Sequence, residues 1–441
     1  MATAEHVSEP VEGLTIPRLL RRNARRFGDR PALTTGPGPE AGTLLWSQLR
    51  AEVAALARGF TVLGLQRGDR VLIAMSERAE HWIADLAAVH VGALPCSTDD
   101  TLSTAQIRAV ARHSAATVLV LEGEEQLRRW RPVLDDLSHL RAVVLLDWSA
   151  APAGDPRFVG YTAVRGALPP DDAGFEELTD AVAPDQPLAL VYAPGATGGP
   201  EGVVLSHREV IHESLTQDRR LPVPDHPRSV ACPPAGHVAE RALGMYLPIR
   251  HAGHVTLCPE PDQLLPALRA VRPHAFFGTP GVWEGLAATL RAKLAELPEE
   301  RTVAPGQTRT TAPAAHRPHS GGGDVPTDPA ETPERLDARV ARPLREAVGL
   351  DDCHRALSGG APLPAGVPEF LASVGLPVHE VRGVGEATGA AATGAATTGA
   401  ATTGAAEART AETGETPPGP SPRRHVAADE PHTAAIEPTH P

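Results

Sequence analysis

The sequence predicts an α/β fold in which mostly parallel sheets are covered by helices. Short runs such as residues 70–75 (RVLIAM) and 117–122 (TVLVLE) are apolar on both faces, as strands buried in a parallel sheet are. Segments such as residues 45–65 and 81–92 carry apolar residues three and four positions apart, which predicts helices. The two patterns alternate over residues 45–297, and this alternation is typical of βαβ units.

The other predicted elements follow the same alternation in chain order. Ser103 is the N-cap of a helix over residues 103–116, and a second helix follows over residues 124–137. The strands are predicted at residues 142–147, 188–193, 228–234, 254–258, 275–280, 354–362 and 377–383. The helices are predicted at residues 237–249, 262–273, 281–297, 334–350 and 365–375.

Two stretches of the chain lack this pattern. Residues 298–334 are rich in Pro, Thr and Gly with few apolar residues, which predicts a flexible insertion. Residues 387–441 contain no leucine and no aromatic residue, so they cannot bury a core and are predicted to form a disordered C-terminal tail. The predicted folded domain therefore comprises residues 1–297 and 335–386, separated by the insertion.

Composition excludes several classes of partner and location. The net charge of −13 argues against nucleic acid, whose binding depends on clustered Lys and Arg. Four cysteines without a CxxC pair indicate neither a zinc knuckle nor a disulfide framework, which fits a reducing cytoplasm. No apolar run reaches the roughly 18 residues of a membrane span. We therefore expect a cytoplasmic protein with at most peripheral membrane contact, for example through the basic LRRNARR segment near residue 20.

A glycine-rich loop at residues 191–207 (VYAPGATGGPEGVVLSH) indicates phosphate binding. Glycines let backbone N–H groups approach a polyphosphate closely, and a strand before the loop and a helix after it fit this use. Such loops normally also carry hydroxyls and a lysine, whereas this one has Pro194, Ala196 and Glu201. No Gly-Lys-Ser/Thr follows the glycines, which excludes a P-loop NTPase.

Four motifs together give the chain a family resemblance. PGATGGPEG (residues 194–202) is similar to a phosphate loop of the form SGTTGxPKG, and PPAGHVAERALGMYLP (233–248) resembles a segment that carries a histidine near an acyl pocket. VRPHAFFGTPGVWEGL (271–286) resembles the next family block, and ALSGGAPLP (356–364) matches the adenine-contacting segment. Over most of residues 15–386 the chain resembles the adenylate-forming enzymes, and among them the long-chain acyl-CoA synthetases.

The resemblance implies a fold, a reaction and a set of ligands. The fold is that of the N-terminal domain of adenylate-forming enzymes. In the reaction, a carboxylate attacks the α-phosphate of ATP to give an acyl-adenylate and pyrophosphate, and the thiol of coenzyme A then displaces AMP. The implied cofactors are ATP or AMP and Mg²⁺, with coenzyme A as co-substrate, and the implied partners are a small-molecule acid and a nucleotide.

The resemblance also assigns roles to individual residues. Thr197 and Glu386 would be catalytic, Glu386 would also bind magnesium, and His237 would contact the substrate. The residues implied to bind the nucleotide are Gly195, Thr197, Gly198, Gly199, Gly202, Ser358, Gly359, Gly360, Ala361, Pro362 and Gly383.

Three departures from the family pattern point to impaired activity. Glu201 stands where the family has a lysine, and two unit charges about 4 Å apart interact by roughly 4 kcal/mol at an effective dielectric constant of about 20. Gly385 stands where a threonine would touch the α-phosphate. The family's ribose-binding aspartate and lysine-bearing C-terminal domain do not follow Glu386. The predicted function is therefore an impaired long-chain fatty acid–CoA ligase.

Other interpretations stay open. The chain could be a non-catalytic pseudoenzyme that binds a nucleotide or an acyl group, or a reading-frame error could have replaced the end of a full-length ligase. His237 could equally be a capping or packing residue, and Glu240 with Arg241 reads as an ordinary structural pair on a helix. His251 and His254 lack a third ligand for a metal site.

Overall fold

The computed structural model describes residues 12–36, 41–98, 102–194, 200–232, 240–297 and 336–381. All of these belong to one unit of the chain, Met1–Ala395, and the second unit, Ala396–Pro441, lies outside the described residues. The predicted insertion and the predicted tail also lie outside them. The division into domains and the flexibility of these two stretches therefore remain predictions.

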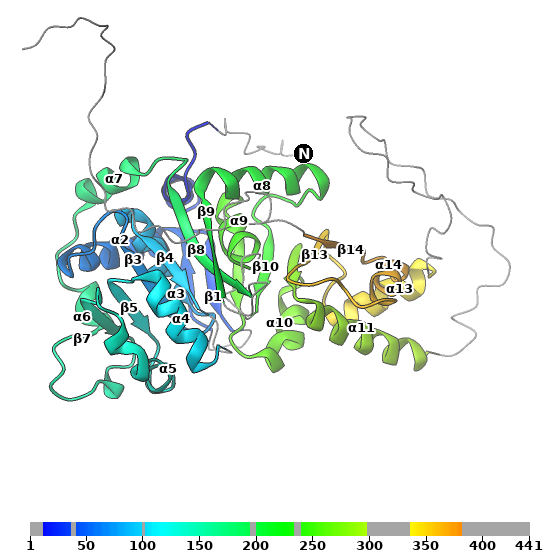
Figure 1. Ribbon diagram of the computed structural model, residues 1–441. Helices are drawn as coiled ribbons and strands as arrows, with labels where there is room; N and C mark the ends of the chain where they lie inside the picture. Colours follow the sequence, from blue (N-terminus) through cyan, green and yellow to red (C-terminus); the bar gives the residue numbers. More distant parts are fainter. Residues whose placement is uncertain are drawn as a thin grey trace, which may run out of the picture. The chain divides into compact units, whose positions relative to one another are not determined.

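A five-stranded parallel sheet forms the first part of the unit (Figure 1). Its elements are α2 (Trp46–Val62), β3 (Arg70–Ala74), α3 (Ala79–Val91), β4 (Leu94–Ser97), α4 (Thr104–Ser114), β5 (Val118–Leu121), α5 (Glu124–Trp130), the 3-10 helix η1 (Arg131–Asp136), β6 (Ala142–Leu145), the 3-10 helix η2 (Trp148–Ala150) and β7 (Phe158–Gly160). The strand order is β4-β3-β5-β6-β7. Successive strand residues enter different cores: Val118 and Val120 join the cluster that contains α2 and α3, whereas Leu119 and Leu121 join the one that contains α4 and α5. Burial on both faces confirms the prediction from the continuous apolar runs.

A seven-stranded sheet combines the two ends of the described chain. Its strands are β1 (Pro31–Thr35), β2 (Thr43–Leu45), β10 (Arg228–Ala231), β11 (His254–Leu257), β12 (Ala275–Gly278), β13 (Arg355–Ser358) and β14 (Val378–Glu380). The order is β14-β13-β12-β10-β11-β1-β2, and all pairs are parallel except β1 with β2. One face packs on the helices α10 (Leu264–Val271), α11 (Pro280–Ala295), α13 (Ala338–Val348) and α14 (Val367–Ser373), and the 3-10 helix η4 (Pro261–Gln263) precedes α10.

A third sheet is an antiparallel hairpin of β8 (Pro187–Pro194) and β9 (Pro200–Ser206). The short helices α6 (Tyr161–Arg165) and α7 (Asp172–Ala181) precede it, and α8 (His207–Arg220) follows it. Ser206 caps α8 by accepting a hydrogen bond from the Glu209 N–H at 3.2 Å, while Glu209 accepts one from the Ser206 N–H at 2.8 Å. The strand before the loop and the helix after it were predicted from the sequence, but β9 and its pairing with β8 were not.

Two predicted helices change their hydrogen-bonding pattern where a proline enters. The predicted helix over residues 124–137 becomes η1 at Arg131, because Pro132 has no N–H for the α-helical bond. The predicted helix over residues 237–249 is described from Glu240 onward as a π-helix, η3 (Glu240–Tyr246), followed by α9 (Leu247–Arg250) with Pro248 in its first turn. Short π-helical segments are rare and frequently lie at functional sites.

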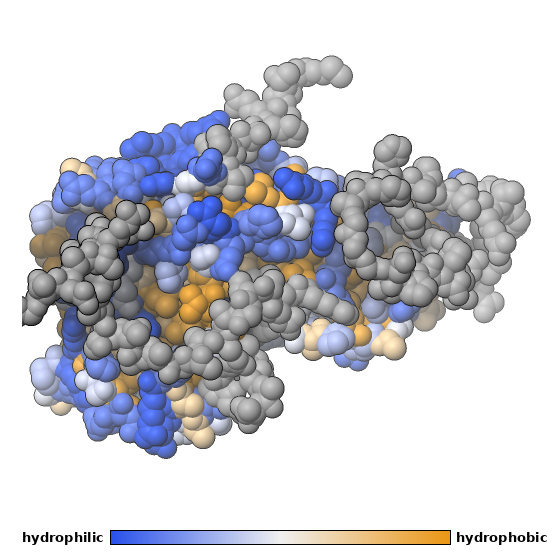
Figure 2. Space-filling view, turned by 45° about the horizontal axis from the view of Figure 1, so that its top comes forward, coloured by the Kyte–Doolittle hydropathy of each residue, from blue (hydrophilic) through white to orange (hydrophobic). Residues whose placement is uncertain are grey.

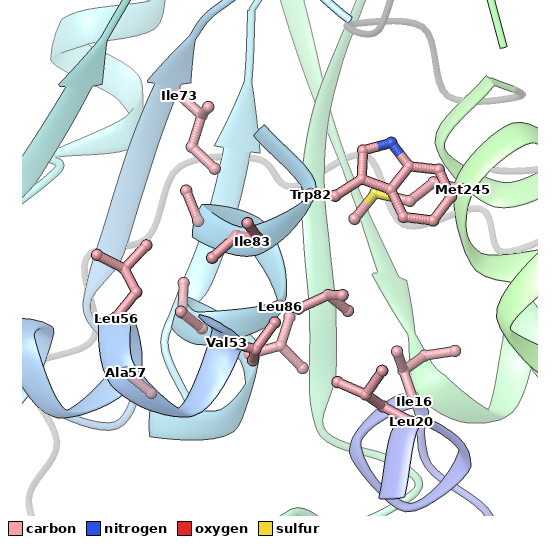
Figure 3. Packing of buried hydrophobic residues seen from close by; sticks show 14 of the residues in the cluster. Ile16, Leu20, Val53, Leu56, Ala57, Ile73, Trp82, Ile83, Leu86 and Met245 are labelled. Carbon is pink, nitrogen blue, oxygen red and sulfur yellow. The ribbon is translucent and has the colours of Figure 1, made fainter. Parts of the chain in front are cut away.

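A large hydrophobic core joins elements that are far apart in the sequence (Figure 3). Ile16 from α1 (Ile16–Arg26), Val53 from α2, Trp82 from α3 and Met245 from η3 all belong to it and are nearly or completely buried. The core therefore links both large sheets through their helices.

The surface is mainly hydrophilic on the face that Figure 2 shows, where orange hydrophobic residues gather toward the middle, beside grey segments. In the described part of the chain, the exposed large hydrophobic side chains are Val62, Trp148 and Leu168. None of the described helices is long and apolar enough to cross a membrane.

Two glycines inside helices give opposite expectations for substitution by alanine. A Cβ on Gly59 of α2 would lie 2.1 Å from the carbonyl oxygen of Val164, whereas a Cβ on Gly285 of α11 would contact nothing within 4 Å. We expect Gly59→Ala to reduce the free energy of unfolding by about 1–3 kcal/mol through overpacking. Gly285→Ala should raise it by about 0.5–1 kcal/mol through helix propensity. Urea unfolding measures both, and a gain in stability for Gly59→Ala would contradict the close helix contact.

Candidate functional site

The carboxyl ends of six parallel strands, β14, β13, β12, β10, β11 and β1, form one edge of the seven-stranded sheet. Gly278 of β12, Ser358 of β13 and Glu380 of β14 lie opposite one another in register. The next strand in the chain, β11, pairs on one side of β10, and β12 pairs on the other side. The strand order therefore reverses between β10 and β12. In open α/β sheets ligands bind at such a switch point, beyond the carboxyl ends of the strands. This edge is the candidate site.

The predicted adenine-contacting segment lies at this edge. Ser358 is fully buried at the end of β13, and its Oγ has no hydrogen-bond partner among the described residues. Gly360 has a φ of +95°, a conformation that favours glycine, and it is exposed together with Ala361 and Pro362, whereas Gly359 is buried. An unsatisfied buried hydroxyl beside an exposed turn fits a polar ligand that approaches from this edge.

Neighbouring contacts hold this segment in place. The Val381 N–H donates to the Ser358 carbonyl at 2.8 Å, and the Leu363 N–H donates to Glu380 Oε1 at 2.9 Å. Trp283 Nε1 of α11 donates to the Leu357 carbonyl at 2.9 Å. The turn is therefore anchored at both ends by hydrogen bonds, which fixes its exposed residues.

The predicted phosphate loop lies at the tip of the β8–β9 hairpin. Pro194 pairs with Pro200, and the residues between them, including Gly195, Thr197, Gly198 and Gly199, lie outside the described residues. Gly202 lies within β9, where an added Cβ would come within 3.0 Å of His113 Cε1 and of Leu190 Cδ1. Packing against neighbouring side chains therefore accounts for a glycine at position 202.

Several other predicted residues cannot be compared with the structure. His237, Gly383, Gly385 and Glu386 lie outside the described ranges, and the side chain of Glu201 is likewise outside the description although its backbone belongs to β9. Their roles in substrate and magnesium binding remain predictions.

A buried polar network at η3 was missed by the sequence reasoning. The sequence predicted an ordinary structural pair of Glu240 with Arg241, and the side chain of Glu240 lies outside the description. The Arg241 side chain is 2% exposed and forms an ion pair with Asp85 of α3, which is 0% exposed. Arg241 also donates to Tyr246 Oη at 2.9 Å and to Ser97 Oγ, and Tyr246 Oη donates to Asp85 Oδ1 at 2.9 Å. Burial alone would lower the pKa of Arg241, but the Asp85 charge outweighs it and raises the pKa above its usual range. An Asp within an otherwise apolar helix (HWIADLAAVHV) was the available signal.

A second polar cluster surrounds Asp218 of α8. Its carboxylate accepts hydrogen bonds from His251 Nε2 at 2.8 Å and Arg355 Nη2 at 2.9 Å, and it also pairs with Arg250. Burial opposes ionisation, but these partners together lower the pKa of Asp218 to about 2. His254 instead lies 2.8 Å from Thr34 Oγ1 through its Nε2. In the part of the chain that the structure describes, no three His, Cys, Asp or Glu side chains are grouped so that they could hold a metal ion.

Comparison with known sequences identifies the family. A family model described as AMP-binding enzyme matches residues 20–420. The long-chain-fatty-acid–CoA ligase ACSBG2 of Xenopus laevis is 27% identical over 393 residues, which cover 85% of this chain and 51% of that protein. The long-chain-fatty-acid–CoA ligase heimdall of Drosophila melanogaster is 25% identical over 401 residues, which cover 87% of this chain and 58% of that protein. The chain thus spans about half the length of the curated relatives it matches.

Solved structures agree at the level of the fold. The A-PCP didomain of the carboxylic acid reductase from Segniliparus rugosus, in complex with AMP, has a TM-score of 0.62 and 19% identity, covering 84% of this chain and 52% of that one. The anthranilate CoA ligase AuaEII, in complex with anthranoyl-AMP, has a TM-score of 0.59 and 16% identity, covering 84% and 60%. These similarities confirm the predicted α/β fold with mainly parallel sheets between helices, as in the N-terminal domain of adenylate-forming enzymes. Since the family model matches far more than half of the sequence, the chain belongs to the AMP-binding enzyme family.

Proposed function

We propose that the chain binds an adenine nucleotide and a carboxylic acid as a fatty acid–CoA ligase does, with an impaired adenylation step. The observation that carries this proposal is the position of residues 358–362 at the carboxyl edge of the sheet, with the unsatisfied hydroxyl of Ser358 beside an exposed turn. The ligase names of the sequence relatives support the choice of reaction.

The chain's own residues would act mainly by positioning. The turn after β13 would hold the adenine, and the backbone of the loop between β8 and β9 would face the phosphates. Beneath the edge, Leu243 and Leu247 pack with Phe277 and Leu357 in a small hydrophobic cluster, which would contact the hydrocarbon part of the acid. Such positioning brings a carboxylate and the α-phosphate together and lowers the entropic part of the barrier.

Magnesium, ATP and coenzyme A enter this proposal only as ligands. Glu386 would hold Mg²⁺ through its carboxylate oxygens, and the ion would supply positive charge to the phosphate oxygens. Thr197 would donate a hydrogen bond from its hydroxyl to the phosphates. His237 would contact the acid.

Glu201 is the reason for proposing impairment. It is adjacent to Gly202 on β9 and pairs with Ala193 in the hairpin register, and it follows the residues of the proposed phosphate loop between Pro194 and Pro200 by two to six positions. A carboxylate in the place of a lysine would repel the β- and γ-phosphates instead of attracting them. The same change favours the second candidate, a pseudoenzyme that binds nucleotide or acyl groups without turnover.

Nucleotide affinity tests this proposal. We expect the native chain to bind AMP at least as tightly as ATP with magnesium, because the adenine segment is intact whereas Glu201 repels the longer phosphate chain. Glu201→Lys should raise the affinity for ATP by about tenfold or more, which corresponds to about 1.4 kcal/mol, and should leave AMP binding nearly unchanged. Calorimetry measures both affinities.

Glu201→Gln is the matched control, because it removes the negative charge without adding a positive one and should give an intermediate ATP affinity.

Pyrophosphate release with palmitate, ATP, magnesium and coenzyme A shows whether the chain is impaired or active. We expect no useful turnover from the native chain or from Glu201→Lys, because parts that act as a unit are not restored singly. A clear preference of the native chain for ATP, or robust turnover, would contradict the proposed impairment.

A further inference from the structure

A pocket lies next to the hydrophobic cluster, toward the amino ends of the strands. Ser229 of β10, Ala275 of β12 and Arg355 of β13 lie opposite one another in register, so their side chains share one face of the sheet and form a row. From the helices, Leu247 and His251 line the other side. The pocket therefore lies between this row, called the polar row after Ser229 and Arg355, and the end of α9, and the rest of its lining is mostly apolar.

The pocket continues the hydrophobic cluster away from the candidate site. Phe277 and Leu357 stand two residues further along β12 and β13 than Ala275 and Arg355, on the same face, and they also line the pocket. Ser358 at the edge is three positions after Arg355 in β13, a distance of about 10 Å along a parallel strand. An acid whose carboxylate lies at the edge would thus run over the hydrophobic cluster and end at the polar row.

The polar row contains a hydroxyl with no partner and an excess of positive charge. Ser229 Oγ is buried and has no hydrogen-bond partner among the described residues. Arg355 is 1% exposed, and together with Arg250 it brings two positive charges to the single negative charge of Asp218. Burial lowers the pKa of His251, so this side chain adds no further charge at neutral pH. A buried excess of one positive charge next to an unsatisfied donor favours an anionic ligand.

The size of the pocket limits it to a small end group. Its volume of about 30 Å³ has room for about two water molecules, which is the size of a carboxylate group. A long alkyl chain needs more space than this and would place methylene groups against Arg355 and Ser229. The polar row therefore limits how far a plain hydrocarbon chain can extend.

We propose that this pocket binds the distal carboxylate of a dicarboxylic acid, with Ser229 and Arg355 as the groups that recognise it. The inference rests on the acid-binding part of the proposed function and names its substrate class. One carboxylate lies at the edge of the sheet, the methylene groups contact Phe277 and Leu357, and the second carboxylate accepts hydrogen bonds in the pocket.

Calorimetry with two acids of eight carbons tests the proposal on the full chain, in the presence of saturating AMP. Suberate carries a carboxylate at each end, and octanoate carries only one. We expect suberate to bind at least tenfold more tightly than octanoate. Ser229→Ala should reduce the affinity for suberate by about tenfold and leave that for octanoate unchanged.

Ser214→Ala is the matched control. Ser214 of α8 is also buried with an unpartnered Oγ, but it does not line the pocket, so both affinities should equal those of the native chain. Equal binding of the two acids, no binding of suberate, or an unchanged suberate affinity in Ser229→Ala would each overturn the inference. If AMP does not bind but suberate keeps its preference and its dependence on Ser229, the nucleotide function fails while the pocket assignment stands.

Discussion

Acidification from about pH 6.5 toward pH 4.5 is expected to remove several kcal/mol from the free energy of unfolding. The cause is a set of three buried histidines, His81, His90 and His207, whose pKa values burial lowers to about 3, 4 and 3. Unfolding returns each ring to water, where it takes up a proton near its ordinary pKa of 6.5. Below that pH the unfolded state binds more protons than the folded state, so stability falls as the pH falls.

These rings stay neutral because they are buried, and burial outweighs the hydrogen bond from His90 to a carbonyl, which by itself favours the protonated ring. His90 Nδ1 donates to the Leu86 carbonyl at 2.7 Å, and His207 Nδ1 accepts from the Ile16 N–H at 3.2 Å. His81 Nε2 lies 2.7 Å from Ser97 Oγ. Each proton contributes about 1.4 kcal/mol per pH unit, so three give up to about 4 kcal/mol per pH unit. Burial raises the pKa values of Glu77 and Asp85, and protonation of these carboxyls in the folded state offsets part of this slope.

Denaturant unfolding at a series of pH values measures this slope. His90→Leu should reduce the slope by the contribution of one proton, because one titrating ring is removed. Phe175→Leu is the control: Phe175 stacks on His90 with ring centroids 4.6 Å apart, so the variant weakens packing but should keep the slope. A pH-independent stability between pH 4.5 and 6.5 would contradict the assignment of these three rings as neutral in the folded protein.

Removing the carboxylate of Asp85 is the substitution with the largest expected effect. Asp85→Ala should destabilise the protein by about 3–5 kcal/mol, since it leaves the buried guanidinium of Arg241 without its counter-charge. The hydroxyl of Tyr246 would also lose its acceptor. Urea unfolding monitored by far-UV circular dichroism measures the loss.

Two further variants test whether the loss of stability in Asp85→Ala comes from the unpaired buried charge of Arg241. Asp185→Ala removes one partner of an exposed ion pair with Arg208 and should give no measurable change. Asp85→Leu combined with Arg241→Met replaces the buried pair by apolar side chains and should recover most of the lost stability. An Asp85→Ala loss as small as that of Asp185→Ala would show that Arg241 finds another partner or reaches water.

The sequence predicted the alternation of elements well, because buried parallel strands and amphipathic helices have different periods. Residues 117–122 and 142–147 could be predicted as strands from their own composition. The pairing of β8 with β9 depends instead on which other strands are available as partners. The spacing of apolar residues within one segment does not reveal its partner strand. The partner of Arg241, Asp85, lies 156 residues earlier in the chain. The residues next to Arg241 in the sequence, such as Glu240, therefore gave no sign of this ion pair.

The candidate site shows the same division. The segment at residues 358–362 was found because a short motif carries it, and its place at the edge follows from the parallel strand order. The row of Ser229, Ala275 and Arg355 was not found, because it combines one residue from each of three strands and exists only through their register. Motifs reveal sites built from one loop, whereas sites built across strands need the fold.

The pairing of β1 with β11 has a consequence for synthesis on the ribosome. Leu33 pairs with Val255, so 222 residues (255 − 33) must follow the first partner before the second is made. At about 5–20 residues per second this takes roughly 10–45 s. All strands of the five-stranded sheet lie between residues 70 and 160 and are available earlier. During that interval residues 31–35 present an unpaired strand edge, the kind of surface that drives aggregation, so the cellular yield of this protein depends on how well its first strand is shielded while the chain is being made.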